Sequence, residues 1–263
     1  MSLRSDTSFS RPHQENQKEY FDKEYSEYHG YKLDNWRVSY LRRIFFDLGM
    51  EGVIDSNYLD IGVGGSGYTV IEAARRGWHS FGTDISPLGM KKAKQFAKSE
   101  LGSKFPPGFI VASAESLPFR DAAFGKLTMI GVLEHVPDDK QTIREIVRVL
   151  EPSGEFLISV PNSYRRIHPL LWLPKSRADR RVGHLRFYKA EDLVSEFARY
   201  GFKLKSVVYT GNFPKVVQIL LTKIVHRVEG RTSRIWWKLE ELDIQMNRLP
   251  SGMQLHLVMK KRN

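Results

Sequence analysis

The sequence predicts an α/β fold built on a doubly wound, mostly parallel sheet of seven strands. From residue 58 onward, short apolar runs alternate with amphipathic helical patterns, and glycines mark many of the turns between them. Strands separated by helices in this way form parallel sheets with right-handed crossovers. The expected strands are 58–61, 79–83, 109–112, 126–131, 155–160, 203–209 and 253–259. The expected helices between them are 68–76, 88–101, 138–150 and 190–200.

The N-terminal part precedes this alternation. Residues 15–31 place five aromatic side chains at near-helical spacing, and residues 36–48 form a second helical pattern that ends at Gly49. We expect residues 1–50 to form an N-terminal helical lid.

A second departure lies near the C-terminus. Residues 214–228 form a basic amphipathic pattern, and Trp236 to Leu242 suggest another helix. We therefore expect a helical insertion over 211–250, before the last strand. The core is then 51–210, completed by a final strand within 251–263.

Composition narrows the function classes. The chain has 263 residues, enough for one substantial domain, and it has no cysteine. This excludes disulfides, thiolate metal sites and cysteine nucleophiles. No apolar run reaches the roughly 18 residues needed to cross a bilayer, and the N-terminus lacks the apolar stretch of a secretory signal. The expected setting is cytoplasmic.

Positive charge is concentrated in one segment. The formal net charge is +11, and residues 161–189 hold eight Lys or Arg residues against one acid, Asp179. This surplus of positive charge gives no information about the fold. It indicates that the segment binds a negatively charged partner, such as a phosphate, a carboxylate or an anionic membrane surface. A solvated loop that keeps the protein in solution is the alternative.

A glycine-rich turn follows the first predicted strand, in the segment Asp60-Ile61-Gly62-Val63-Gly64-Gly65-Ser66-Gly67. Glycines at a strand-to-helix turn let the backbone approach a ligand closely. The spacing Gly62-x-Gly64-x-x-Gly67 alone also fits a dinucleotide site. Asp60 decides between them, because a carboxylate suits the ammonium group of S-adenosylmethionine and does not suit a pyrophosphate.

A second carboxylate ends the second predicted strand. Asp84 can accept hydrogen bonds from both hydroxyls of a ribose, and Ile85 can pack against an adenine. This role serves S-adenosylmethionine or a nicotinamide cofactor equally. The cap of the next helix is better supplied by Ser86 before Pro87, which leaves Asp84 available for a ligand.

Five motifs together resemble the class I S-adenosylmethionine-dependent methyltransferases, within the small-molecule branch of ubiquinone- and menaquinone-biosynthesis-like (type 11) enzymes. In order, they are Leu59-Asp60-Ile61-Gly62-Val63-Gly64, Gly82-Thr83-Asp84-Ile85-Ser86, Ala114-Glu115-Ser116-Leu117-Pro118-Phe119, Val132-Leu133-Glu134-His135-Val136-Pro137-Asp138, and Arg148-Val149-Leu150-Glu151-Pro152-Ser153-Gly154 leading to Val160-Pro161-Asn162. They cover about a hundred residues. The resemblance implies a Rossmann-like fold and S-adenosylmethionine as the cofactor, with no metal.

The resemblance implies further cofactor contacts. Ala114 and Glu115 would line the adenine edge, and Ile130 and Gly131 would lie beside the methionine part. Three positions depart from the family pattern. Ser66 stands where the family has its third glycine, and Ser113 and Gly125 stand where it usually has acids. Ser113 should weaken recognition of the adenine amino group.

Methyl transfer from a sulfonium requires mainly alignment, exclusion of water and, for some acceptors, removal of a proton. His135, after the fourth strand, is the candidate base, and Glu134 is the alternative. Either could instead be a structural residue at the start of a helix.

The basic segment is the candidate acceptor site, because it mixes cationic and aromatic side chains. An anionic, partly apolar small molecule would suit it, methylated on oxygen in preference to nitrogen or carbon. The helix over 214–228 could add an apolar wall or rest on a membrane surface. The candidate acceptor-binding residues are Arg165, Arg166, His168, His184, Arg186 and Tyr188.

Three other functions remain open. The charge favours a nucleic-acid methyltransferase, but the chain has no Asn/Asp-Pro-Pro-aromatic motif after the fourth strand and no evident RNA-binding module. An NAD-dependent oxidoreductase would share the glycine turn. A non-catalytic protein would bind S-adenosylmethionine without turnover. No obligate protein partner is evident.

Overall fold

The computed structural model describes most of the chain. The described residues are 10–26, 57–102, 107–165, 167, 169, 172, 176, 179–180, 182–214, 217, 233–246 and 248–262. The predicted helices 36–48 and 214–228 therefore lie outside the described residues, apart from 214 and 217.

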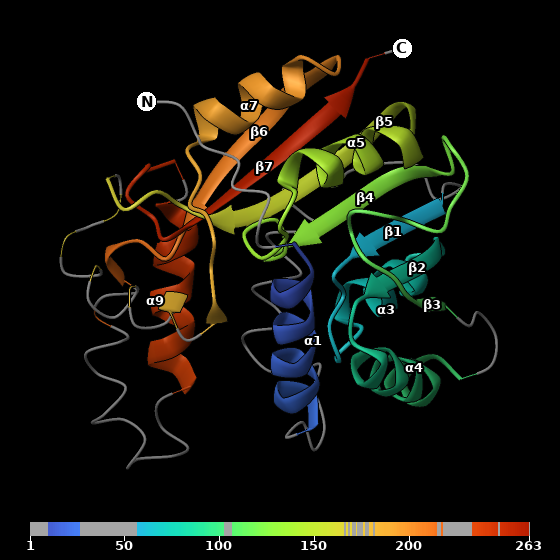
Figure 1. Ribbon diagram of the computed structural model, residues 1–263. Helices are drawn as coiled ribbons and strands as arrows, with labels where there is room; N and C mark the ends of the chain where they lie inside the picture. Colours follow the sequence, from blue (N-terminus) through green and yellow to red (C-terminus); the bar gives the residue numbers. More distant parts are fainter. Residues whose placement is uncertain are drawn as a thin grey trace. The chain divides into compact units, whose positions relative to one another are not determined.

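A seven-stranded sheet organises the fold, in the order β3-β2-β1-β4-β5-β7-β6 (Figure 1). β1 pairs in parallel with β2 and with β4, and β2 pairs in parallel with β3. The predicted α/β class and the seven strands are confirmed. The strands are β1 Asn57–Ile61, β2 His79–Asp84, β3 Gly108–Val111, β4 Phe124–Ile130, β5 Leu150–Pro161, β6 Phe202–Thr210 and β7 Gln254–Lys261.

Six helices are described alongside these strands: α1 Ser10–Ser26, α3 Tyr68–Arg75, α4 Pro87–Leu101, α5 Asp139–Val149, α7 Ala190–Ala198 and α9 Ser233–Gln245. The chain divides into two compact units. The first comprises Met1–Tyr31, Gly52–Phe156 and Lys261–Asn263, and the second comprises Lys32–Glu51 and Leu157–Lys260.

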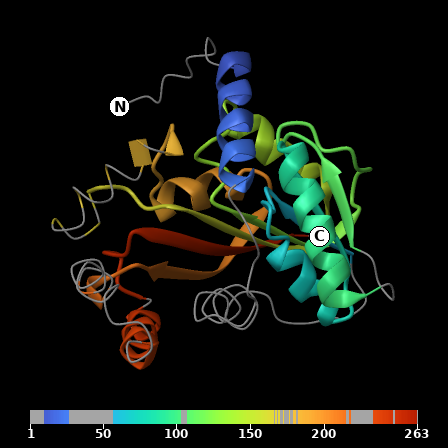
Figure 2. The ribbon, with the colours of Figure 1, turned by 90° about the horizontal axis from the view of Figure 1, so that it is seen from below.

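The first unit contains the glycine turn. Helices α3 and α4 pack against β1, β2 and β3, and α1 packs on α4. Figures 1 and 2 show these helices beside their strands, with α5 along β4. The core consists of apolar side chains from β1, β4 and α5, among them Leu59, Ile61, Leu127, Met129 and Ile146, all almost fully buried.

Local chemistry sets the helix ends as predicted. Ser86 precedes α4 with extended backbone, and its Oγ accepts a hydrogen bond from the Gly89 backbone N at 2.8 Å. Pro87 is the first helical residue, where a missing N–H costs nothing. Gly102 follows the last turn with φ 67°.

The fifth strand begins earlier than its predicted start at residue 155, because β5 starts at Leu150, directly after α5. The predicted turn at 152–154 lies within it: Ser153 has φ 61°, and a Cβ added to Gly154 would lie 2.9 Å from the Glu151 backbone O. The first helix also begins earlier than predicted, at Ser10.

In the second unit, buried polar side chains form hydrogen bonds with the backbone of the segments next to β6 and β7. The carboxylate of Asp243, on α9, accepts hydrogen bonds from the backbone N of Gly211 and of Asn212. The side-chain amide of Asn162 donates to the backbone O of Gly252 at 2.7 Å. Among the described residues, no helix is both long enough and apolar enough to span a membrane.

Candidate cofactor site

The glycine turn leaves the carboxyl end of β1 through left-handed backbone. Gly62, Gly64 and Gly67 have φ of 77°, 66° and 62°, a region that side chains disfavour. Gly67 precedes the first residue of α3 in this conformation. The backbone N of Gly62 donates to the Thr83 O at 2.7 Å, which holds the turn against β2.

Gly62 is also required for space. A Cβ at this position would lie 2.1 Å from Cγ2 of Val132, which follows β4. The turn after β1 and the turn after β4 are therefore in contact at one edge of the sheet, where a ligand would meet both.

Asp84 braces the turn from the end of β2. Its Oδ2 accepts a hydrogen bond from the Gly64 N at 3.0 Å, and its Oδ1 accepts one from the Ser86 N at 2.9 Å. The side chain is 7% exposed. Burial raises the pKa of Asp84 to about 6, and the negative charge of Asp22 adds to the rise. Its role toward a ribose stays a prediction.

Asp60 lies deeper, beneath the turn, and is 2% exposed. Its Oδ1 accepts a hydrogen bond from the Thr128 hydroxyl at 2.6 Å, and its Oδ2 accepts one from the Thr69 hydroxyl. Burial raises the pKa of Asp60 to about 7, although both hydrogen bonds favour the charged form. Thr69, on α3, and Thr128, on β4, were not predicted as partners, because they lie 9 and 68 positions from Asp60 in the sequence.

The loop after β3 carries the residues predicted at the adenine edge. Ala114 is buried, and Ser113 Oγ accepts a hydrogen bond from the Glu115 N and lies 3.3 Å from Glu115 Oε2. Glu115 Oε1 accepts a hydrogen bond from the backbone N of Asp138 at 2.8 Å. Glu115 thus joins this loop to the start of α5.

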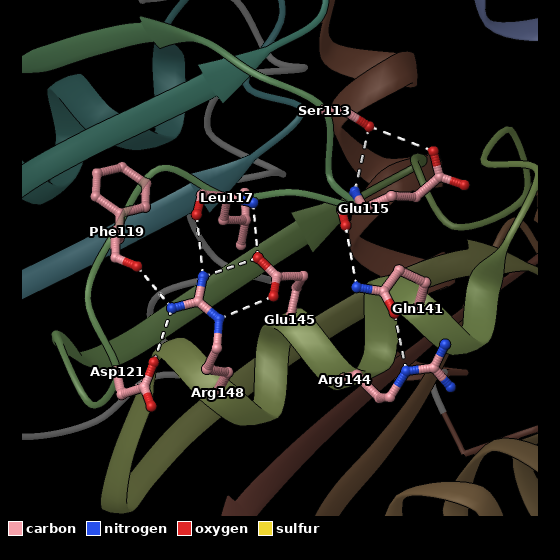
Figure 3. Close-up of polar contacts among 9 residues, drawn as sticks. All are labelled: Ser113, Glu115, Leu117, Phe119, Asp121, Gln141, Arg144, Glu145 and Arg148. Atoms are coloured by element: carbon pink, nitrogen blue, oxygen red, sulfur yellow. Dashed lines mark hydrogen bonds and ion pairs between the residues drawn. The ribbon is translucent and has the colours of Figure 1, made fainter. Parts of the chain in front are cut away.

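An ion pair on α5 fixes the rest of this loop (Figure 3). Arg148 donates two hydrogen bonds to Glu145, from Nε and Nη2, both at 2.8 Å. Its Nη1 reaches the Phe119 backbone O at 2.6 Å and Asp121 at 2.9 Å. Glu145 in turn accepts from the Leu117 N at 2.7 Å. One Arg–Glu pair therefore holds both ends of the segment 117–121.

The turn after β4 carries the predicted methionine contacts and bases. Ile130 is half-buried and Gly131, with φ 67°, is exposed, so this edge is open to a ligand. The Glu134 side chain is 2% exposed. The half-buried ring of His135 packs edge-on against Phe21 of α1, at 5.6 Å between ring centres.

The predicted acceptor residues belong to the second unit. Arg165 is exposed, Arg186 is half-buried, and the ring of Tyr188 is buried beside the strand residue Asn162. Arg166 and His168 lie outside the described residues.

His184 has a partner that sequence analysis did not assign. Its Nδ1 lies 2.9 Å from Oδ1 of Asp179, whose side chain is 6% exposed. The Tyr164 hydroxyl donates to the other oxygen of Asp179. Burial and Asp179 raise the pKa of Tyr164 well above its usual value. The sequence did offer one indication of this pairing, because Asp179 is the one acid in the basic segment.

Comparisons with known proteins agree with this geometry. Residues 59–158 match the model of a family described as a methyltransferase domain. Norajmaline N-methyltransferase of Rauvolfia serpentina is 34% identical over 113 residues, covering 43% of this chain and 38% of the relative. Ubiquinone biosynthesis O-methyltransferase of Idiomarina loihiensis is 27% identical over 168 residues, covering 60% and 66%. The chain thus covers less than two thirds of each relative.

The fold is also that of a solved methyltransferase. The crystal structure of geranyl diphosphate C-methyltransferase from Streptomyces coelicolor A3(2), with Mg2+, geranyl diphosphate and S-adenosyl-L-homocysteine, has a TM-score of 0.67. The match covers 96% of this chain and 98% of that one at 15% sequence identity. At this identity the likeness concerns the fold alone.

Residues 59–158 therefore form a methyltransferase domain. The relatives that share it include enzymes of ubiquinone and menaquinone biosynthesis. The family predicted from the five motifs is confirmed.

Proposed function

We propose that this chain transfers a methyl group from S-adenosylmethionine to a small acceptor that is anionic and partly apolar. The observation that carries the proposal is the pairing of a left-handed glycine turn with Asp84 at the adjoining end of β2. The glycines of the turn carry no side chains of their own, and the carboxylate at the adjoining strand end could accept hydrogen bonds from ribose hydroxyls.

The residues present fit this donor. Asp84 would hold the ribose, Ile85 and Ala114 the adenine, and Ile130 and Gly131 the methionine part. Asp60 would act on the ammonium group through water or through the turn, because its own oxygens already accept from Thr69 and Thr128. Bound S-adenosylmethionine supplies a methyl group already activated by the sulfonium.

The chain's part in the reaction is to align the acceptor, exclude water and take up a proton. His135 is the proposed base, since it follows β4 at the same sheet edge and its ring is half-buried. Glu134 is the alternative, but its side chain is 2% exposed, which leaves little of the carboxylate within reach of an acceptor. His135→Asn should lower kcat and leave donor affinity unchanged, whereas a structural role would alter both.

The charge of segment 161–189 supports an anionic acceptor. Its one acid, Asp179, is buried and bound to Tyr164, while Arg165 and Arg180 are exposed. Among the described residues of the segment, these two arginines are thus exposed to solvent, where an anionic acceptor could reach them. His184, held by Asp179, would complete the acceptor site. Oxygen is the proposed methylated atom.

The test is turnover on a panel of acceptors, followed by mass spectrometry of the product and of S-adenosylhomocysteine. The panel should pair phenolic and quinol acids with their neutral esters, and it should include tRNA. Preference for the acids supports the proposal. Turnover of tRNA alone, with an affinity that falls steeply with salt, would show a nucleic-acid enzyme instead. Donor binding without turnover on any acceptor would contradict catalysis.

Asp84→Asn tests the donor site separately. Loss of hydrogen bonds to a charged group should weaken donor binding by about 1.5–3 kcal/mol. Asp121→Asn is the matched control, because its carboxylate is exposed and pairs with Arg148 and not with the glycine turn. Equal affinity of both variants would remove Asp84 from the site.

A further inference from the structure

Helix α1 places one aromatic ring directly on the glycine turn. A Cβ added to Gly64 would lie 3.2 Å from Oη of Tyr25, and a Cβ added to Gly65 would lie 3.2 Å from its Cδ1. A Cβ added to Gly89, in the first turn of α4, would lie 2.8 Å from Cδ2 and Cε2. The two edges of the ring thus face two separate stretches of backbone.

Backbone conformation does not explain two of these glycines. Gly64 has positive φ, but Gly65 and Gly89 do not. Gly89 even lies inside a helix, where glycine is less stable than alanine by about 1 kcal/mol. The contact that excludes a side chain at Gly89 comes chiefly from Tyr25, with Ser86 Oγ as the next neighbour at 3.2 Å.

Polar contacts fasten α1 around this ring. The Ser86 hydroxyl, which caps α4, also donates to the carboxylate of Asp22. Lys92 Nζ donates to the backbone O of Tyr25 and, at 3.2 Å, to that of Ser26, the last residues of α1. A lysine at the end of a helix satisfies carbonyls that lack partners within it. α1 is therefore held at both sides of the ring.

We propose that Gly64, Gly65 and Gly89 form a slot for Tyr25, and that the seated ring retains the methyl donor in its site. This rests on the proposed function, which puts the donor on the same turn. With the ring in place, the turn is covered, and α1 must lift before the donor or its product can leave. Tyr25 is a positioning residue in this scheme, and Gly65 and Gly89 lack side chains in order to admit it.

The slot is tested without any donor by a double-mutant cycle. Gly89→Ala should expel the ring and speed tryptic cleavage of α1 after Lys18 and Lys23 by about tenfold or more, because a released helix opens more often. In a Tyr25→Ala background the same substitution should leave the cleavage rate unchanged. The contact between the added methyl group and Ser86 is present in both backgrounds, so it cancels from the difference between them. An equal effect of Gly89→Ala in both backgrounds would overturn the slot.

Retention is tested by the dissociation rate of S-adenosylhomocysteine, followed by stopped-flow fluorescence. Tyr25→Ala and Gly89→Ala should each speed dissociation by about tenfold, since most changes in affinity appear in the off-rate. Tyr25→Phe keeps the ring and should stay within about twofold of the parent. Tyr20→Ala is the control and should leave the rate unchanged, because that ring packs edge-on against Phe21 and is not among the atoms nearest to Gly64, Gly65 or Gly89.

The outcomes separate the two proposals. If the cleavage cycle shows coupling between Gly89 and Tyr25 but the dissociation rates are unchanged, the ring does not retain the donor. The proposed function would still stand. A parent protein that fails to bind S-adenosylhomocysteine would overturn the proposed function and retention together, while the cleavage cycle would still decide whether the slot exists.

Discussion

Donor affinity should depend steeply on pH, because both carboxylates of the site resist ionisation in the free protein. Burial raises the pKa of Asp60 to about 7 and that of Asp84 to about 6. A donor with a sulfonium and an ammonium group favours the charged form of a nearby carboxylate, and ribose hydroxyls bind an ionised acceptor more strongly than a protonated one. Binding should therefore release protons below pH 7, and affinity should rise as the pH rises.

The size of the effect follows from these values. If both groups must ionise, the fraction of competent protein rises by about 500-fold between pH 5 and pH 7. The pH range of the measurement ends at pH 7, because the α-amino group of the donor begins to lose its proton near pH 8. Asp60→Asn should reduce the change to about tenfold, the share of Asp84.

Isothermal titration calorimetry with S-adenosylmethionine, in buffers of different ionisation enthalpy, measures the affinity and the protons released together. Circular dichroism at each pH serves as the control that the protein stays folded. An affinity that is flat from pH 5 to pH 7 would refute the reasoning. So would an Asp60→Asn variant that keeps the full pH dependence.

Three further predictions concern the fold around the site. Gly62→Ala should cost about 3 kcal/mol or more, because its Cβ would lie 2.1 Å from Val132 on left-handed backbone; chemical denaturation should show this loss, with partial recovery in a Val132→Ala background. Arg148→Met should destabilise the protein by about 2–4 kcal/mol in the same assay, because it leaves Glu145 without its cation. An effect below about 0.5 kcal/mol would contradict the role of the Arg148–Glu145 pair in holding the segment 117–121. The ligand-free protein should lose stability as the pH rises from about 4 to 7, because the folded state holds its protons to higher pH than the unfolded chain; for Asp60 alone this amounts to about 4 kcal/mol, and Asp60→Asn should flatten the slope.

Much of the first unit could be predicted from the sequence because its signals are local. The cap at Ser86 and the glycine turn after β1 each depend on a few neighbouring residues, and both were predicted. Strand and helix order followed from the same local patterns. The start of β5 at Leu150 was not predicted, although the turn-forming Pro-Ser-Gly sequence does turn the chain at Ser153.

The contacts between distant segments could not be predicted in this way. Asp60 reaches Thr128 across 68 positions, and Ser86 reaches Asp22 across 64. Neither spacing carries a pattern in one sequence. The ring of Tyr25 was noticed as part of an aromatic helix, but its place on the glycine turn depends on how α1 packs on α4.

The most direct test of this account is a crystal structure with S-adenosylhomocysteine bound. We predict the ribose hydroxyls on the carboxylate of Asp84, the homocysteine part over Gly62 and Gly131, and the ring of Tyr25 closed over the turn. A ligand bound elsewhere, with this edge of the sheet left empty, would contradict the assignment of the donor site.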